Sequence, residues 1–195
     1  MSDVPTIYLV RHGETEWSKS GRHTGRTDIA LTAKGEVDAV KIGNRLAGIR
    51  FSHVLTSPLI RARRTCELAG FAGVVDPGLM EWDYGEYEGL KSAEIKANRP
   101  GWELFRDGSP GGESVSEITE RVDGVVHRLK ALSGNVLVFA HGHLLRVLSA
   151  RWVEQPVSFG RSLLLSTATV CILGFDHRSP DEPAISLWND DRHLA

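Results

Sequence analysis

Strand-like and helix-like runs alternate along most of this 195-residue chain. The strand-like runs are short and rich in β-branched, aromatic or other apolar residues. We expect strands over residues 6–10, 54–56, 135–140, 169–175 and 184–188, and helices over about 33–47, 59–69, 115–132 and 144–153. This alternation predicts an α/β fold, a three-layer αβα sandwich whose mostly parallel central sheet is covered by helices on both faces.

Two of the expected helices have clear local signals. Thr32 is placed to cap the first of them, in which the apolar residues Val37, Val40 and Ala47 recur at helical spacing. Ser114 begins a capping-box pattern before the helix with the most continuous apolar stripe. That stripe consists of Val115, Ile118, Val122, Val125, Val126, Leu129 and Leu132. These stripes predict which side of each helix packs against the sheet.

No break in composition divides the chain, so residues 1–195 are expected to form one domain. The stretch from about 86 to 112 interrupts the regular pattern, because it is weakly periodic and contains several glycines and prolines. Such excursions from a sheet often form the wall of a binding site. We therefore expect a lid-like segment there.

The balance of charge excludes some classes of function. The chain has 23 Lys and Arg against 25 Asp and Glu, a formal net charge of −2, which argues against binding to nucleic acid or to an anionic membrane. Cys66 and Cys171 lie in apolar stretches without metal-ligand spacing and are expected to be buried thiols. With no leader-like or membrane-spanning stretch, the expected location is the cytoplasm. The sequence leaves open whether the chain forms a homodimer.

Several residues with useful chemistry follow the expected strands. In an open parallel sheet, ligands bind beyond the carboxyl ends of the strands, so residues that follow different strands meet there. The candidates are Arg11-His12-Gly13 after the first strand, Arg61 after the second, Glu81 before a turn-like segment, and His141-Gly142-His143 after strand 135–140. We expect them to converge on one edge of the sheet.

This set of side chains suits the handling of a phosphate monoester. The guanidinium fork of arginine matches the geometry of phosphate oxygens, and an unprotonated imidazole can attack phosphorus. The leaving alkoxide needs a proton, which a carboxylic acid can give. Glu81 lies between apolar neighbours, so we expect it to be buried, which favours the protonated acid.

Other interpretations of the same residues are weaker. His141 and His143 could be two metal ligands, but no cluster of Asp, Glu or Cys nearby in the sequence completes a coordination shell. We therefore predict no metal site. A single histidine after a strand is commonly a structural residue, and His12 gains its catalytic interpretation from Arg11 beside it and from the motifs that follow.

The order of these motifs resembles that of a known family. They are Arg11-His12-Gly13-Glu14-Thr15, Thr24-Gly25, Ser57-Pro58-Leu59 with Arg61, Glu81 with Gly85, Gly112-Glu113-Ser114, and His141-Gly142. Together they span about three quarters of the chain and resemble the histidine phosphatase superfamily, in its phosphoglycerate-mutase-like branch. The resemblance implies the same phosphoglycerate-mutase-like sandwich fold.

The resemblance also implies roles for individual residues. His12 would be the phosphorylated nucleophile, and Glu81 would give a proton to the leaving group and then take one from water. The phosphoryl oxygens would be held by Arg11, Arg61 and His141. The substrate side would be lined by Thr24, Gly25, Tyr84, Gly142 and His143. Ser18 departs from the family, because many mutases have an asparagine there that contacts the phosphate.

The resemblance favours a phosphatase over a mutase. The mutases usually carry a longer insertion before the Gly-Glu-Ser motif, with an adjacent arginine pair, whereas this chain has only the separated Arg99 and Arg106. We predict a phosphomonoesterase that acts on a small phosphorylated metabolite without a cofactor. The alternatives are a cofactor-dependent phosphoglycerate mutase, which would need a bisphosphoglycerate primer, and an inactive module that binds a phosphorylated ligand.

Overall fold

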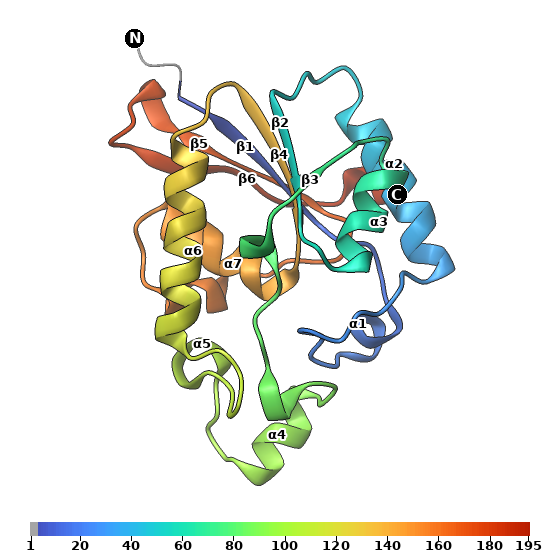
Figure 1. Cartoon of the computed structure of the whole chain (residues 1–195), viewed down its shortest axis with the longest axis vertical. Coiled ribbons are helices and arrows are strands. Elements are labelled where there is room, and N and C mark those ends of the chain that lie inside the picture. The colour runs from blue at the N-terminus through green and yellow to red at the C-terminus, as the bar shows by residue number, and fades with distance from the viewer. Residues whose placement is uncertain (1–3) are drawn as a thin grey trace.

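The computed structural model of the protein describes residues 4–195, and six strands form one sheet (Figure 1). The strands are β1 (Thr6–Arg11), β2 (His53–Thr56), β3 (Val74–Val75), β4 (Asn135–Ala140), β5 (Val170–Phe175) and β6 (Pro183–Asp190). Their order is β3-β2-β4-β1-β5-β6. The first four run parallel to one another, while β5 is antiparallel to β1 and β6 is antiparallel to β5. The predicted, mostly parallel sheet is confirmed.

Helices cover both faces of the sheet (Figure 1). The α-helices are α1 (Glu16–Ser20), α2 (Ala33–Leu46), α3 (Ile60–Leu68), α4 (Ser92–Asn98), α5 (Leu104–Asp107), α6 (Val115–Lys130) and α7 (Gly142–Trp152). The 3-10 helices are η1 (Pro77–Leu79), η2 (Gly85–Tyr87), η3 (Val157–Ser162), η4 (Asp176–Arg178) and η5 (Arg192–Leu194). Helices α6 and α7 pack on one face, and α2 and α3 pack on the other. This is the predicted three-layer sandwich.

The central strands divide the core in two. In β4, Val136 and Val138 belong to the apolar cluster under α6 and α7, whereas Leu137 and Phe139 belong to the cluster under α2 and α3. Alternate side chains of a strand point to opposite faces, so a strand buried on both faces is apolar throughout. Of the stripe predicted for α6, the residues from Ile118 to Leu129 are buried as expected, whereas Val115 and Leu132 are half-buried.

The apolar face predicted for α2 is wrong. Val37 and Val40 are 58% and 47% exposed, and Ala47 follows the end of the helix. The buried face carries Ala39, Ile42 and Leu46 instead, together with Gly35 and Asp38. Both sets recur at helical spacing, but Ile42 and Leu46 bring larger side chains to the sheet, and burial of more apolar area is favoured.

The structure also extends the predicted set of elements. Helix α1 and the two-residue strand β3 were not predicted, since neither has a periodic stretch long enough to detect. Helix α7 begins at Gly142, two residues before the predicted start. Within residues 4–195, no helix is long and apolar enough to cross a membrane.

Residues 86–112, for which a lid-like excursion was predicted, are held at both ends by backbone hydrogen bonds. The N–H of Glu86 donates to the carbonyl of Pro110 at 2.9 Å, and the N–H of Glu113 donates to that of Asp83 at 3.0 Å. Between these bonds the chain forms α4 and α5, which extend past the carboxyl ends of β1 and β4 (Figure 1). We call residues 86–112 the lid.

Candidate active site

The carboxyl ends of β1 and β4 lie side by side at a cleft under the lid. Arg11 ends β1 and pairs in register with Ala140, so His12 and His141 follow the two strands as neighbours. Their ring centroids are 5.2 Å apart. The cleft has a volume of about 190 Å³ and is lined by Arg11, His12, Ser18, Gly21, Arg22, His23, Thr24, Glu81, Tyr84, Ser92, Gly142, His143, Arg146 and Leu165.

His12 is held as a neutral imidazole with one nitrogen free to react. Its Nδ1 lies 2.8 Å from the carbonyl oxygen of Gly13, which can only accept, so Nδ1 carries the proton and Nε2 keeps its lone pair. Burial lowers the pKa of His12 well below the ordinary 6.5, and the positive charges of Arg61 and Arg11 lower it further. The geometry and the charge both favour an unprotonated Nε2, which is the form that acts as a nucleophile.

The backbone around His12 is fixed from several directions. The N–H of His12 donates to the carbonyl of Ala140 at 3.0 Å, and the N–H of Gly13 donates to Oγ1 of Thr65 at 3.0 Å. A Cβ on Gly13 would lie 2.5 Å from the carbonyl oxygen of Gly35, so only glycine fits where this loop passes the start of α2. His12 therefore sits on a rigid support.

Arg61 and His141 lie behind His12 and do not line the cleft. Nε of Arg61 donates to Nδ1 of His141 at 3.1 Å, so the proton of the neutral ring is on Nε2, which donates to Oγ of Ser57 at 2.7 Å. The guanidinium also donates to the carbonyls of Thr24 and Gly25, both at 2.9 Å. Direct contact of Arg61 and His141 with a phosphoryl group stays a prediction.

Glu81 is buried, as predicted, and caps the start of α7. Its Oε1 accepts the N–H of Leu144 at 2.8 Å and the N–H of Trp82 at 2.9 Å, while Oε2 accepts the N–H of His143 at 3.0 Å. His141, the residue at the N-cap position, gives no side-chain cap. The carboxyl group therefore satisfies the free N–H groups of α7 and is held at the cleft wall.

Arg11 lines the cleft, and one of its donors has no partner among the described residues. Its Nη1 donates to the carbonyl of Leu165 at 2.5 Å, while its buried Nε has no hydrogen-bond partner among residues 4–195. A Cβ on Gly142 would lie 3.2 Å from both Cζ and Nε of Arg11, so the glycine leaves room for the guanidinium. A buried donor without a partner is costly unless a ligand accepts from it.

The other predicted substrate-side residues divide into two groups. Thr24, Tyr84 and His143 line the cleft, and the hydroxyl of Tyr84 lies 2.5 Å from Nδ1 of His143. Burial raises the pKa of Tyr84 and lowers that of His143. Gly25 does not line the cleft; a Cβ there would lie 2.6 Å from Oε2 of Glu88, so this glycine allows close packing of the loop that carries Thr24.

Ser18 lines the cleft, but its hydroxyl is already engaged. Its Oγ donates to the carbonyl of Thr15 at 2.9 Å and accepts the N–H of Thr15 at 2.9 Å. With the bond from the Ser18 N–H to Oγ1 of Thr15, these contacts form the capping box of α1. Ser18 has a structural role here, and its contact with phosphate stays a prediction.

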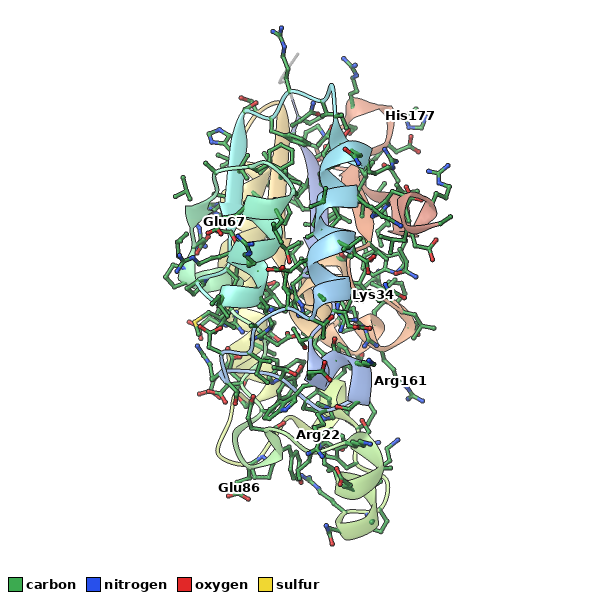
Figure 2. The ribbon with its side chains drawn as sticks, turned by 90° about the vertical axis from the view of Figure 1, so that its right-hand side faces the viewer. Arg22, Lys34, Glu67, Glu86, Arg161 and His177 are labelled. Atoms are coloured by element: carbon green, nitrogen blue, oxygen red, sulfur yellow. The ribbon has the colours of Figure 1, made fainter. Side chains whose placement is uncertain are left out.

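Sequence reasoning missed three basic residues of the cleft: Arg22, His23 and Arg146. Arg22 and His23 come from the loop after α1, which has no periodic signal, although they directly precede the predicted Thr24. Arg146 lies on α7 three residues after His143, so helical spacing from the His141-Gly142-His143 motif could have found it. Figure 2 shows Arg22 in the half of the molecule that carries the lid.

The cleft concentrates positive charges that form no ion pairs within the described residues. Among residues 4–195, Arg11, Arg22 and Arg146 form no ion pair with a carboxylate. Of the described residues that line the cleft, Glu81 is the only acid. Such a cleft attracts anions, and a low-dielectric wall strengthens the attraction.

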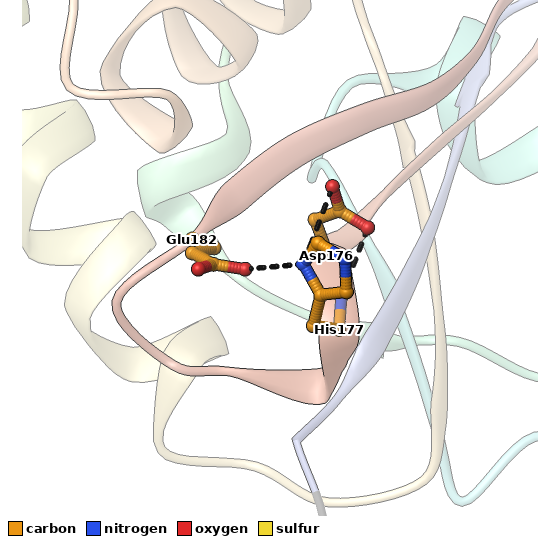
Figure 3. A group of neighbouring side chains, drawn as sticks. All are labelled: Asp176, His177 and Glu182. Carbon is orange, nitrogen blue, oxygen red and sulfur yellow. Dashed lines mark hydrogen bonds and ion pairs between the residues drawn. The ribbon is translucent and has the colours of Figure 1, made fainter.

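One trio of side chains could hold a metal ion, but it lies at the other end of the sheet. Asp176, His177 and Glu182 are exposed at the turn between β5 and β6, where Nδ1 of His177 lies 2.8 Å from Oε2 of Glu182 (Figure 3). Because β5 is antiparallel to β1, this turn is beside the amino end of β1, away from the cleft. The trio therefore has no place in the chemistry of the cleft.

The cleft combines three groups in one place: a free imidazole nitrogen, guanidinium donors and a carboxyl group. An imidazole can attack phosphorus, and guanidinium groups can neutralise the charge on the phosphoryl oxygens as it moves from the leaving group to the nucleophile. A carboxyl group can supply and recover the proton. The arrangement suits transfer of a phosphoryl group.

Comparison with known proteins agrees with this chemistry. A sequence profile of the histidine phosphatase superfamily (branch 1) matches residues 7–191. An acid phosphatase of Mycobacterium tuberculosis is 40% identical, over 97% of this chain and 96% of its own. A sedoheptulose 1,7-bisphosphatase of Saccharomyces cerevisiae is 36% identical, over 94% of this chain and 92% of its own.

A relative that is named as a mutase and a solved structure complete the comparison. A protein of Erwinia tasmaniensis named as a probable phosphoglycerate mutase is 35% identical, over 84% of this chain and 82% of its own. The solved structure of an open reading frame of Mycobacterium tuberculosis superimposes with a TM-score of 0.90 at 37% identity, covering 94% of this chain and 96% of its own. The chain thus shares its fold and much of its sequence with these proteins.

Proposed function

The chain belongs to the histidine phosphatase superfamily, branch 1, and we propose that it hydrolyses small phosphate monoesters through a phosphoryl group carried on His12. The observation that carries this proposal is the state of His12. Its Nδ1 proton is committed to the carbonyl of Gly13, so its Nε2 is unprotonated, and Arg11 lines the same cleft. Relatives named as phosphatases, at 40% and 36% identity, support hydrolysis as the outcome.

The proposed reaction has two steps. Nε2 of His12 attacks phosphorus, the P–O bond to the leaving group breaks, and the alkoxide takes a proton from the carboxyl group of Glu81. Water then attacks the phosphohistidine and gives its proton to Glu81, which releases inorganic phosphate and restores the imidazole. We expect Arg11, which lines the cleft, to donate to a phosphoryl oxygen in both steps.

The proposed reaction uses no metal and no organic cofactor. The chemistry of the donor set supports this, because the cleft offers one carboxyl group and its oxygens already accept three backbone N–H groups. Hard divalent cations need several oxygen ligands. We expect hydrolysis to be unchanged by a chelator, and loss of activity that returns when a divalent cation is added would contradict this part of the proposal.

Replacement of the nucleophile tests the proposal. His12→Ala should lower kcat for release of phosphate by about four orders of magnitude, since removing a covalent nucleophile leaves only the binding contribution. Brief incubation of the native protein with substrate, followed by an alkaline quench, should leave an acid-labile phosphoryl group that mass spectrometry places on His12. The matched control is His177→Ala, an exposed histidine at the other end of the sheet, which should retain full activity.

The second candidate function is that of a phosphoglycerate mutase, which the relative from Erwinia tasmaniensis favours. The lid favours hydrolysis, because it lacks the adjacent arginine pair that the mutases usually carry. Arg106 donates to the carboxylate of Asp107 and to the carbonyl of Gly101, and it is separated from Arg99 in the sequence. Interconversion of phosphoglycerates faster than hydrolysis, and stimulated by bisphosphoglycerate, would establish the mutase. Phosphate binding without turnover of any substrate would instead indicate an inactive binding module.

We also propose that the protein acts in the cytoplasm on small molecules and binds neither nucleic acid nor membrane. Cys66 and Cys171 support a reducing compartment, because both are free thiols buried in the core. Burial raises the pKa of Cys66 to about 11 and that of Cys171 to about 12, which keeps them unreactive. Cell fractionation with an antibody to the protein would test the location.

A further inference from the structure

An ion pair lies behind the segment that carries Glu81. Arg121, on α6, binds the carboxylate of Glu113 in a bidentate manner, with Nε donating to Oε1 at 2.6 Å and Nη2 donating to Oε2 at 2.7 Å. The two side chains are largely buried, with 19% of Arg121 and 13% of Glu113 exposed. Neither residue lines the cleft, and no step of the proposed reaction uses either of them. A bidentate pair of this kind fixes the relative position of the groups that it joins.

The guanidinium of Arg121 also holds the backbone that leads into Glu81. Its Nη1 donates to the carbonyl of Gly78 at 2.8 Å and to that of Met80 at 2.9 Å. The carbonyl of Met80 belongs to the peptide bond between Met80 and Glu81, so this contact fixes the chain directly before the carboxyl residue. Because arginine presents its donors in a rigid fork, one side chain holds Glu113 and these carbonyls in a fixed relation.

Glu113 holds the residues that follow Glu81. Its Oε2 accepts the N–H of Asp83 at 3.1 Å, and its carbonyl oxygen accepts the indole N–H of Trp82 at 2.9 Å. The N–H of Glu113 donates in turn to the carbonyl of Asp83 at 3.0 Å. Trp82 is fully buried, so packing of its ring adds to the hydrogen bond. The ion pair therefore contacts the chain on both sides of Glu81.

The position of Glu81 depends on such contacts, because residues 80–84 form no helix or strand that would fix them. The carboxyl group is bound to the start of α7 through the N–H groups of His143 and Leu144. The backbone is bound to α6, which packs beside η1, through Arg121 (Figure 1). A group that transfers a proton has to be held within about 0.5 Å of its productive position, and supporting contacts of this kind provide that precision.

We propose that Arg121, paired with Glu113, positions Glu81 for proton transfer to the leaving group. This inference rests on the proposed function, in which the carboxyl group of Glu81 gives its proton to the alkoxide as the P–O bond breaks. Arg121 touches neither the substrate nor the carboxyl group and acts through the backbone on either side of Glu81. Without it, the segment shifts and the leaving group departs without a proton.

Aryl phosphates that differ in the acidity of the leaving phenol test the proposal. 2,4-Dinitrophenolate is a stable anion that leaves without a proton, whereas departure of phenolate is faster when an acid protonates it. Arg121→Met should lower kcat/KM for phenyl phosphate by at least about tenfold and keep that for 2,4-dinitrophenyl phosphate within about twofold of the native value. A merely structural defect reduces the amount of active protein, so it lowers both values by the same factor. The ratio of the two values is therefore the readout.

Arg151→Met is the matched control. Arg151 also binds a carboxylate of α6 in a bidentate manner, with Nε and Nη2 at 2.6 Å and 3.0 Å from the oxygens of Asp123, but it lies near the far end of α7. Its replacement should leave the ratio unchanged. Arg121→Lys keeps a charge beside Glu113 without the fork, so it should change the ratio in the same direction by a smaller factor.

The lysine variant also keeps the test decisive if Arg121→Met does not fold, since removal of one partner leaves the carboxylate of Glu113 unpaired in a largely buried place. Urea unfolding shows which variants are folded under the conditions of the assay. An unchanged ratio in every Arg121 variant that folds would overturn the proposal.

Glu81→Gln separates this inference from the proposed function. If Arg121 acts through Glu81, adding Arg121→Met to Glu81→Gln should change the ratio by less than about twofold, and a larger change would show that Arg121 acts by another route. Hydrogen exchange at the N–H of Asp83 measures the support without turnover, and it should be faster in Arg121→Met and unchanged in Arg151→Met. If exchange is faster while Glu81→Gln leaves the ratio unchanged, the arginine supports the segment but Glu81 is not the acid, and that part of the proposed function fails. If Glu81→Gln alone changes the ratio, only the inference fails.

Discussion

At the scale of single residues, burial sets the charge of His12, the proposed nucleophile. His12 is only 4% exposed, and the positive charges of Arg61 and Arg11 act on it. Both effects oppose the protonated ring, so its pKa lies well below 6.5. Burial and these two charges thus keep His12 unprotonated at acidic pH, where an ordinary histidine would be protonated.

The pH dependence of His12 reactivity should show this shift. Diethylpyrocarbonate modifies only the neutral imidazole, so the rate at His12, followed by peptide mass spectrometry, should fall only well below pH 6.5. The same residue in the urea-unfolded protein serves as the reference and should titrate near 6.5. A native titration at or above the unfolded one would show that the folded protein does not stabilise the neutral ring.

At the scale of helices and strands, the sequence predicted the site best where a motif directly follows a buried strand. The runs after β1 and β4 placed His12 and His141 side by side, because parallel strands bring their carboxyl ends to one edge. Arg61 was placed in the correct region, but the pattern did not indicate that its donors would go to carbonyl groups and to His141.

The parts that could not be predicted depend on contacts between distant segments. Ser18 closes a capping box, and Glu81 caps a helix that begins more than sixty residues later in the chain. For α2, two sets of residues had the same helical spacing, and only packing against the sheet selects Ile42 and Leu46. Periodicity in the sequence predicts the helices and strands, whereas the hydrogen-bond partner of each polar group is determined only when distant segments come together in the folded chain.

At the base of the lid, stability should depend on the close approach of two backbone segments at a glycine. Gly85 has φ 48°, and a Cβ there would lie 2.3 Å from the N of Gly112 and from the carbonyl oxygen of Pro110. Gly85→Ala should lower the free energy of unfolding by about 2–4 kcal/mol, because two backbones would have to separate. The change should also lower kcat/KM, since Gly85 directly follows Tyr84 of the cleft.

A matched glycine in the lid isolates the effect of packing. Gly101 also has a positive φ, of 79°, but a Cβ there meets nothing within 4 Å. Gly101→Ala should cost only the conformational strain of about 1–2 kcal/mol and leave the activity near the native value. Urea unfolding and steady-state kinetics of the two variants provide the comparison. Equal losses of stability would mean that the contact between the ends of the lid contributes nothing.

At the scale of the whole molecule, the site makes the fold sensitive to acid. Three buried histidines of the site, His12, His141 and His143, have pKa values well below 6.5, while in the unfolded chain each is near 6.5. Below pH 6.5 the unfolded chain binds protons that the folded protein excludes, so stability is complete above this pH and is lost as the pH falls below it. Three protons correspond to at most about 4 kcal/mol per pH unit, which is large against a typical total of about 5–15 kcal/mol.

Urea unfolding at several pH values between 7.5 and 5 should therefore give a free energy of unfolding that declines steeply below 6.5. His141→Asn removes one of the three titrating groups, so the slope should fall by about one third even though the variant is less stable at neutral pH. His177→Asn, an exposed control at the β5–β6 turn, should leave the slope unchanged. The proposed phosphate site exists only in the folded protein, so we expect excess phosphate to raise stability at every pH. A flat profile between pH 6.5 and 5 would show that these histidines accept protons in the folded protein, and the neutral His12 on which the proposed attack depends would then be lost at mildly acidic pH.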